Sequence, residues 1–522
     1  MARIGVDVGG THTDAVLMSG STVLATVKRH TSQDVTSGIV DALQAGLAAA
    51  GLQPKAVQAV MIGTTHFTNA VVERRGITPV AVIRLGLPAT RALPPFSGWP
   101  ASLRQALGEH VYLCHGGHEF DGRHISSLDE SEIRMVVQDL KSRGLSSVAV
   151  TSVFSPMNDG FEQRVAEIIG SELPNSRLSL SCEIGRLGLL QRENATILNA
   201  CLRGLADGIT DALASALHTS GIDAPLFLSR NDGTVMDLEH ASRYPVMTFS
   251  SGPTNSMRGA AFLSGLSDCV VVDIGGTTSD IGVLTHQFPR EATLESEIGG
   301  VRTNFRMPDV LSIGLGGGSV VRGQGERISI GPDSVGHELP RRAMVFGGDT
   351  LTATDLAVAG GLADIGDRSL VDCLEAELVA QGLHILRSTV LSAVDRMLSA
   401  QRDLPLIMVG GGSVLLPDRL EELADVRRPE HYAVANAIGA AIAQVSGEVD
   451  RIVSSDGEDS RAQLLDQAKV AAAEKAVSAG ASPATVTIVE VDEVPLTYLP
   501  GRVTRLRVKA VGDLEISKPS AP

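Results

Sequence analysis

The sequence predicts an α/β protein in which many glycine turns join short apolar strands to amphipathic helices. Of the 522 residues, 55 are glycine and only 3% are aromatic, while alanine, valine, leucine and isoleucine dominate the 43% that are hydrophobic. Short apolar runs alternate with stretches whose apolar residues recur at helical spacing. A glycine hairpin pattern also occurs twice, once in each half of the chain. A chain of this length forms about two to four domains with sizeable cores.

The two copies of the glycine pattern match position by position. The first reads Asp7-Val8-Gly9-Gly10-Thr11-His12-Thr13-Asp14, and the second reads Asp273-Ile274-Gly275-Gly276-Thr277-Thr278-Ser279-Asp280. An apolar run precedes and follows each copy, which is typical of a tight β-hairpin whose tip exposes backbone N–H groups. Such a tip suits a phosphate group. Two ordinary hairpins with Gly-Gly turns are the alternative, but the duplication is more specific than either copy alone.

The residue types in these hairpins suit a polyphosphate. Glycine lets the backbone approach phosphate closely, hydroxyls donate hydrogen bonds, and a carboxylate beside phosphate is favourable when a hydrated Mg²⁺ lies between them. Asp7 and Asp273 are therefore the candidates for binding Mg²⁺ through water. The candidate phosphate ligands are Gly9, Gly10, Thr11, Thr13, Gly275, Gly276, Thr277 and Thr278.

A third polar turn follows the first hairpin. The sequence predicts a helix over 35–51 and a strand over 57–62 that ends in a Gly-Thr-Thr turn. Because that turn opens the next helix, Thr64, Thr65 and Asn69 are candidate contacts to a nucleotide or substrate. The alternative is a plain threonine cap of the helix.

Residues 108–130 hold the densest set of side chains that can bind metal. They are Cys114, His115, His118, Asp121 and His124. The Cys-His-x-x-His spacing is not a standard zinc spacing, and no second ligand pair follows nearby. Polar loop residues are the favoured interpretation, and a metal site that uses the three histidines is the alternative.

A βαβ unit follows over residues 129–169, and a long helix spans 192–217. Between them, Glu183 and Arg186 form a salt-bridged loop in the favoured interpretation and face a substrate in the other. Farther along, Ser251 begins a hydroxyl-rich turn that either covers the nucleotide or caps the helix after it.

Two more glycine turns are candidate parts of a cleft. Gly316 and Gly317 belong to a glycine loop over 312–319, where backbone can line a cleft, and mobility without function is the alternative. The predicted strand 404–409 ends in a turn where a flat ring can lie against the backbone. The candidate adenosine ligands are therefore Gly410, Gly411, Gly412 and Ser413, with a plain strand-to-loop turn as the alternative.

In the C-terminal part, the sequence predicts a close-packed helix over 434–445 and an acidic linker over 447–460. A helix over 461–478 and strands over 484–493 and 503–511 are predicted to follow.

Charge and composition exclude several classes of function. The net charge of −16 argues against a nucleic-acid binder, so an anionic nucleotide would be held by backbone donors and Mg²⁺. The five cysteines are far apart and include no CxxC pair, which favours reduced thiols. We expect a cytoplasmic protein without a membrane span, because we find neither a leader sequence nor a run of 18 apolar residues.

In order along the chain, these motifs resemble the hydantoinase/5-oxoprolinase A-type family (hydantoin utilization protein A-like), within the ATPase superfamily of actin, heat-shock chaperones and sugar kinases. The matching segments are 63–74, Ser251-Gly252-Pro253, the second hairpin and 312–336. The resemblance covers residues 2–446. It implies two actin-like, ribonuclease H-like lobes over 1–182 and 183–446, followed by a small C-terminal α+β unit over 447–522.

The resemblance also implies an activity. ATP would phosphorylate the ring carbonyl oxygen of a cyclic amide or imide, such as a hydantoin, 5-oxoproline or a related lactam, and water would cleave the C–N bond. Asp7, Asp273 and Thr277 form the implied catalytic set, with Asp273 as the candidate base. Chains of this type usually work with a B-type partner subunit, and related members carboxylate ketones. A small-molecule kinase or a non-metabolic ATP-driven switch is the alternative, and a homo-oligomer is compatible with the sequence.

Overall fold

The structure is a computed structural model, and it describes residues 2–9, 12–30, 35–292, 296–304, 307–323, 328–398, 404–454, 461–496 and 503–515. Two of the predicted phosphate ligands, Gly10 and Thr11, lie outside these residues. Within the described ranges, no helix is long and apolar enough to span a bilayer.

A nine-stranded sheet forms the first lobe, in the order β22-β23-β21-β10-β9-β4-β1-β2-β3. Its strands are β1 (Ala2–Val8), β2 (His12–Ser19), β3 (Thr22–His30), β4 (Val57–Thr64), β9 (Leu226–Ser229), β10 (Thr234–Asp237), β21 (Gln444–Ser454), β22 (Thr487–Pro495) and β23 (Val503–Gly512). Strands β1, β2 and β3 are antiparallel neighbours, whereas β4 runs parallel to β1 and β9 runs parallel to β4.

The second lobe repeats this connectivity in the sheet β13-β12-β11-β19-β20, to which β16 adds a further pairing. Its strands are β11 (Cys269–Ile274), β12 (Ser279–Thr285), β13 (Phe288–Pro289), β16 (Val310–Ile313), β19 (Leu406–Val409) and β20 (Val426–Arg427). Again three antiparallel strands come first and two parallel strands follow. The prediction of two α/β lobes that each contribute a glycine hairpin is confirmed.

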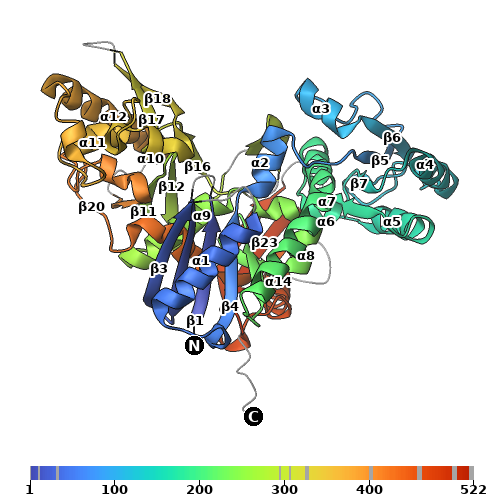
Figure 1. Ribbon diagram of the computed structural model, residues 1–522. Coiled ribbons are helices and arrows are strands. Elements are labelled where there is room, and N and C mark those ends of the chain that lie inside the picture. The colour runs from blue at the N-terminus through green and yellow to red at the C-terminus, as the bar shows by residue number, and fades with distance from the viewer. Residues whose placement is uncertain are drawn as a thin grey trace.

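A parallel four-stranded unit is inserted in the first lobe, in the order β6-β5-β7-β8. It comprises β5 (Ala81–Leu87), β6 (His110–His115), β7 (Ser147–Ser152) and β8 (Arg177–Leu180) with α3 (Ala101–Leu107), α4 (Glu130–Arg143) and α5 (Gly160–Glu172). In Figure 1 this unit lies at the upper right and the second lobe at the upper left, with the first-lobe sheet below and between them.

The remaining elements cover the sheets or connect them. The helices are α1 (Val35–Ala50), α2 (His66–Glu73), α6 (Ser181–Ile184), α7 (Leu189–Thr219), α8 (Leu238–Arg243), α9 (Ser251–Ser264), α10 (Leu339–Arg342), α11 (Ala353–Ala359), α12 (Ala376–Met397), α13 (Ala435–Ala441) and α14 (Arg461–Ser478). Two small hairpins pair β14 (Ser296–Ile298) with β15 (Val301–Thr303) and β17 (Ser319–Arg322) with β18 (Ser329–Ser334).

Strand periodicity explains how each lobe is packed. On β1, Ile4 and Val6 pack in one cluster with α1, whereas Gly5 between them faces α13. On β11, Val270 and Val272 pack with α12, whereas Val271 packs with α9. Helices α13 and α9 therefore each cover the inner face of one sheet, and they also contact each other.

The α9–α13 contact brings the two helix backbones together. A Cβ atom on Gly439 would lie 1.8 Å from the Asn255 carbonyl oxygen, and one on Gly259 would lie 1.9 Å from the Ala435 carbonyl oxygen. Any side chain here would force the helices apart, so only glycine fits. The two lobes are joined through this close contact.

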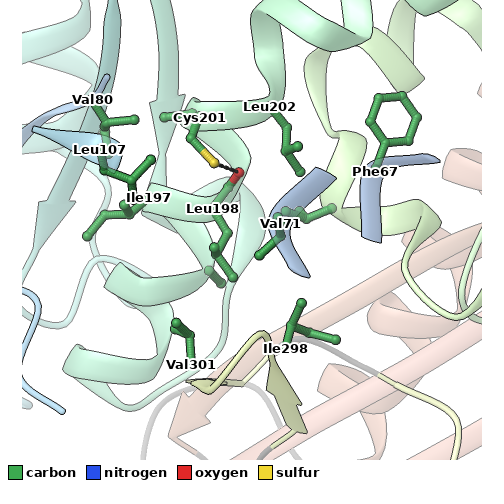
Figure 2. Packing of buried hydrophobic residues seen from close by; sticks show 14 of the residues in the cluster. Phe67, Val71, Val80, Leu107, Ile197, Leu198, Cys201, Leu202, Ile298 and Val301 are labelled. Atoms are coloured by element: carbon green, nitrogen blue, oxygen red, sulfur yellow. Dashed lines mark hydrogen bonds between the residues drawn. The ribbon is translucent and has the colours of Figure 1, made fainter. Parts of the chain in front are cut away.

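The long helix α7 contributes to a hydrophobic core cluster that it shares with α2 and the β14–β15 hairpin (Figure 2). Its residues Ile197, Leu198 and Leu202 pack in one cluster with Phe67 and Val71 of α2 and with the β14–β15 hairpin. The buried Cys201 thiol contacts the Leu198 carbonyl oxygen at 3.1 Å, and burial raises the pKa of this thiol well above its usual range. It is a core residue with low reactivity.

The C-terminal unit continues the first-lobe sheet. Helix α14 has the predicted bounds, and β22 and β23 match the two predicted strands closely. The prediction that 447–460 is a linker is wrong for 447–454, because these residues pair with β23 as part of β21. Gly447 lies directly under α14, where a Cβ atom would meet the Ala472 carbonyl oxygen at 2.2 Å. The predicted boundaries at 182 and 446 stay predictions.

Candidate functional site

The two glycine hairpins have the same local geometry. Asp7 pairs across the first hairpin with Asp14, and Asp273 pairs across the second with Asp280. The turn is closed by a hydrogen bond from the Gly9 N–H to the His12 carbonyl oxygen at 3.0 Å and, in the second copy, from the Gly275 N–H to the Thr278 carbonyl oxygen at 2.9 Å. The duplication inferred from the sequence is thus a structural repeat.

Asp7 is a buried carboxylate with an amide donor. It is 8% exposed, and Nδ2 of Asn436 donates to its Oδ2 at 2.9 Å and to Oδ2 of Asp14 at 3.3 Å. Lys28 pairs with Asp14 at 2.8 Å. Burial, followed by the charge of Asp14, raises the pKa of Asp7 to about 7. A cation at this position would stabilise the ionised carboxylate.

Asp273 is the counterpart of Asp7 in the second lobe. Burial raises the pKa of Asp273, and the charge of Asp14 adds to that increase, whereas a hydrogen bond with the Ser256 hydroxyl opposes it. The charge of Asp273 in turn contributes to the raised pKa of Asp7. The carboxylates of both lobes therefore face a common region, where one divalent cation would relieve their mutual repulsion.

Each of these carboxylates lies over a glycine of the neighbouring parallel strand. A Cβ atom on Gly63 would lie 2.6 Å from Asp7 Oδ1, and one on Gly410 would lie 2.1 Å from Asp273 Oδ1. Gly410 also has a φ of +81°, which L side chains rarely adopt. These two glycines are therefore required for the positions of the two carboxylates.

The predicted adenosine turn lies against the second hairpin. A Cβ atom on Gly412 would be 2.5 Å from the Gly275 carbonyl oxygen, whereas Gly411 is exposed with open space around it. The Ser413 hydroxyl is buried and forms no hydrogen bond with any described residue. The turn thus combines an open backbone surface with a hydroxyl group that lacks a partner.

The predicted glycine loop packs beneath the same hairpin. The Gly317 N–H donates to the Gly275 carbonyl oxygen at 3.0 Å, and a Cβ atom on Gly316 would lie 2.6 Å from the Thr277 nitrogen. Thr277 and Thr278 are exposed at the tip. Gly316 and Gly317 shape the second turn, and their contact to a substrate stays a prediction.

The Gly-Thr-Thr turn lies at the edge of the sheet beside the first hairpin. Thr64 pairs with Val8 across β4 and β1, and its backbone oxygen lies 3.4 Å from the Ser251 hydroxyl. Thr64 and Ser251 are buried, Thr65 is half-buried and Asn69 is exposed. Their roles in binding remain predictions. Thr13, by contrast, is 1% exposed, so its side chain lies in the core.

The histidine-rich segment lies on the four-stranded unit. His118 is buried with its ring 4.5 Å from the Phe161 ring and 5.1 Å from that of the exposed His124. His115 is paired with Glu132 at 3.3 Å. Nowhere in the described ranges do three or more His, Cys, Asp or Glu side chains converge as a metal-binding group would require. The metal-binding alternative for the three histidines stays a prediction.

Sequence reasoning did not assign a role to Asn436 of α13 or to Asn255 and Ser256 of α9. Asn436 and Ser256 contact the two carboxylates, and Asn255 lies beside Gly63 with its Nδ2 3.1 Å from the Ser229 hydroxyl. The signal in the sequence was a single amide, Asn436, in an otherwise apolar Ala/Gly-rich helix. Such a half-buried polar group among apolar neighbours favours a hydrogen-bond partner.

Comparison with known proteins gives two family matches. The model described as "Hydantoinase/oxoprolinase N-terminal region" matches residues 3–173, and the one described as "Hydantoinase/oxoprolinase" matches residues 192–367. The chain is 27% identical over 398 residues to the acetophenone carboxylase gamma subunit of Aromatoleum aromaticum. This match covers 69% of this chain and 53% of that protein. It is 24% identical over 472 residues to the caprolactamase subunit alpha of Pseudomonas jessenii. This match covers 80% of this chain and 66% of the caprolactamase subunit. The chain thus spans about half the length of the first relative and 66% of the second.

Solved structures agree with the fold. An ATP-dependent caprolactamase from Pseudomonas jessenii superposes with a TM-score of 0.78 at 19% identity, covering 100% of this chain and 89% of that chain. A nucleotide-free acetone carboxylase superposes with a TM-score of 0.70 at 17% identity. The superposition covers 100% of this chain and 90% of the acetone carboxylase chain. Together with the repeated sheet topology, these likenesses confirm two actin-like lobes with a small C-terminal unit.

Proposed function

Because the chain belongs to the hydantoinase/oxoprolinase family, we propose that it catalyses the ATP-dependent hydrolysis of a cyclic amide or imide. Among its relatives are a caprolactamase subunit and the 5-oxoprolinase of Saccharomyces cerevisiae, which is 23% identical over 414 residues. The observation that carries the proposal is the pair of matching hairpins. Their carboxylates, the buried Asp7 and the half-buried Asp273, lie close enough for the charge of Asp273 to affect the pKa of Asp7.

The donor set of this region suits Mg-ATP. Gly9 and Gly275, whose N–H groups close the two turns, would let the backbone approach the phosphates, and the exposed hydroxyls of Thr277 and Thr278 would donate hydrogen bonds to them. The open backbone at Gly411 and the buried hydroxyl of Ser413 suit the adenosine group. Mg²⁺ held through water by Asp7 and Asp273 would neutralise the charge of the transferred phosphoryl group.

The proposed reaction has two steps. The carbonyl oxygen of the substrate attacks the γ-phosphorus of ATP, and ADP leaves. In the second step, water adds to the activated carbon and the C–N bond breaks with a proton passing to nitrogen, which leaves an acyl phosphate. A second water hydrolyses this acyl phosphate to the carboxylate and inorganic phosphate. Positioning and charge neutralisation supply most of the acceleration in phosphoryl transfer. Within this scheme Asp273 is the candidate base, and Thr277 is the candidate donor at the transferred phosphoryl group.

We further propose that a B-type partner chain completes the second step. Two of the relatives are named as subunits, an alpha subunit and a gamma subunit, which supports an assembly of several chains. The nucleotide site proposed above is formed by residues of this chain alone. The first step is therefore expected to proceed without the partner, although it would be slow.

The test is ATP turnover by the purified chain with hydantoin, 5-oxoproline and caprolactam, each with and without a candidate B-type partner. We expect substrate-stimulated release of ADP together with a ring-opened product, detected by mass spectrometry. Asp273→Asn is expected to abolish both signals. A stable phosphorylated product would instead identify a small-molecule kinase, and ATP hydrolysis that no cyclic amide changes would identify an ATP-driven switch.

A second candidate is supported by the relative named acetophenone carboxylase gamma subunit. Phosphorylation of a ketone at its enol oxygen uses the same arrangement of phosphates and carboxylates as phosphorylation of an amide oxygen. Acetophenone, tested with ATP and bicarbonate under the same conditions, discriminates between the two. Ketone-stimulated ADP release without any response to cyclic amides would favour this candidate.

A further inference from the structure

A cavity of about 630 Å³ lies outside the region of the two hairpins. It is enclosed by the turn that joins β9 to β10, by β10 and β21, by the end of α14, and by the loop that precedes α7. None of the hairpin or glycine-loop residues discussed above lines it. Its volume is typical of sites that bind a small organic molecule.

Three cations on the wall of this cavity contact only neutral oxygens. Arg230 donates to the Ser446 hydroxyl at 3.1 Å, Arg451 to the Leu464 carbonyl oxygen at 3.1 Å, and Lys475 to the Glu448 carbonyl oxygen at 2.9 Å. No described carboxylate forms an ion pair with any of them. In addition, Nε of Arg230 is buried without a hydrogen-bond partner among the described residues. A buried guanidinium donor without an acceptor is costly unless a ligand satisfies it.

Most carboxylates on the same wall are already paired with other cations. Glu183 is 2.6 Å from Arg243, and Asp232 is 2.9 Å from Lys509. The Arg505 guanidinium donates to Asp450 at 2.8 Å. Asp237 accepts a hydrogen bond from the backbone N–H of His240, where it caps α8. Among the described residues of the wall, Arg230, Arg451 and Lys475 are thus the cations without an ion pair.

The charge of Arg230 acts on groups around the cavity. Burial alone would raise the pKa of Asp232, but Arg230 and Lys509 hold the pKa of that carboxyl well below its usual range. Burial, followed by the charge of Arg230, lowers the pKa of His240 to about 4. His240 is therefore neutral at physiological pH and adds no further charge to the cavity.

The rest of the wall is apolar and adaptable. Val235, Met236 and Val246 are each at most 5% exposed, and Met247 lies beside them. Methionine side chains have several rotatable bonds, so they fit ligands of varied shape. The cavity thus offers an apolar surface next to a guanidinium group whose Nε has no hydrogen-bond partner among the described residues.

We propose that this cavity is a binding site for a small organic carboxylate, whose anionic group pairs with Arg230 and whose apolar body packs on Val235, Met236 and Val246. Arginine suits a carboxylate because its planar group donates two parallel hydrogen bonds. Lys475 supplies a second positive charge at the rim. The proposal does not depend on the proposed function, because it uses none of the residues assigned to ATP.

The test is calorimetric titration of the full chain with 4-phenylbutyrate, with 4-phenyl-1-butanol as the neutral analogue and inorganic phosphate as the anion alone. We expect measurable binding of 4-phenylbutyrate and binding of the alcohol that is weaker by about tenfold or more. Equal binding of the acid and the alcohol, or no binding of the acid, would overturn the proposal. Tighter binding of phosphate than of 4-phenylbutyrate would also overturn it, because the apolar wall would then have no role.

Two variants with matched controls locate the site. Arg230→Gln is expected to weaken 4-phenylbutyrate binding by about tenfold or more, and Lys475→Gln by a smaller factor. The controls are Arg427→Gln, which removes an exposed arginine in the second lobe, and Lys469→Gln on the same helix as Lys475. Since Lys475→Gln changes only a partly exposed helix residue, it separates loss of binding from loss of folding. If both variants bind 4-phenylbutyrate as the controls do, the proposed site is wrong.

Discussion

Nδ2 of Asn436 lies 2.9 Å from Oδ2 of Asp7 and 3.3 Å from Oδ2 of Asp14, so a single amide from α13 holds both carboxylates of the first hairpin. Because α13 also contacts α9, and the Ser256 hydroxyl of α9 lowers the pKa of Asp273, the two inner helices act on one carboxylate from each lobe. Asn436 is therefore a positioning residue for the proposed Mg-ATP site.

The first prediction concerns Asn436→Asp. This change places a third carboxylate beside Asp7 and Asp14 and removes the amide donor, so the pKa of Asp7 should rise further. Protonated Asp7 cannot attract a cation. ATP turnover measured against pH should therefore begin to fall at a higher pH than in the unchanged protein. At pH 7 we expect turnover to be reduced by about tenfold or more. Asn436→Ala should produce a smaller displacement. An acidic limb that stays in place for Asn436→Asp would show that this amide does not control Asp7.

The second prediction concerns stability without nucleotide. The pKa of Asp7 is raised from 3.8 to about 7 in the folded protein, so folding favours the protonated form. The stability from this group is complete below its unfolded pKa and is lost as pH rises toward 7. Asp7→Asn should therefore stabilise the protein more at pH 8.5 than at pH 5.0, as measured by melting temperature without Mg²⁺. Asp211→Asn, at an exposed site on α7, is the control that should show no such difference.

The third prediction concerns Gly410. Alanine at this position would place its Cβ atom 2.1 Å from Asp273 Oδ1 and would require a φ of +81°. The carboxylate must move, so we expect Gly410→Ala to reduce ATP turnover by about a hundredfold or more. Gly208→Ala, where a Cβ atom meets nothing within 4 Å, is the matched control. Full activity of Gly410→Ala would contradict the assigned position of Asp273.

The fourth prediction concerns the contact between the inner helices. In Gly439→Ala the new Cβ atom would lie 1.8 Å from the Asn255 carbonyl oxygen, which forces α9 and α13 apart. We expect the free energy of unfolding to fall by about 1–3 kcal/mol. Denaturant titration measures the change. Gly170→Ala in α5 should be neutral or slightly stabilising, because helix propensity favours alanine and its Cβ atom has open space.

Local patterns predicted the hairpins well, because their glycines, hydroxyls and flanking apolar runs lie together in the chain. The convergence of Gly316 and Gly412 on Gly275 also followed from the expectation that all three turns line one region. The contact between Asn436 and Asp7 joins residues 429 positions apart, and no local pattern encodes such a pairing. Asn436 was therefore not among the predicted site residues.

The segment 447–454 shows a second limit. Its glycine, serine and acidic residues are depleted from strands on average, which led to the expectation of a linker. Pairing with β23 and cover by α14 outweigh those local preferences, because Val449 becomes buried and Gly447 lets the helix approach. Tertiary context decides the structure of such a segment.

The nine-stranded sheet determines what would happen if the chain were cut after residue 446. The remaining start of β21 would lose its pairing with β23, and the apolar residues Met61 and Val235 would lose Val508 and the alanines of α14, with which they share a core. A short strand with open N–H and C=O groups beside a bare apolar face is a template for pairing with other chains. A fragment that keeps only the two lobes would therefore aggregate, even though it would retain both hairpins.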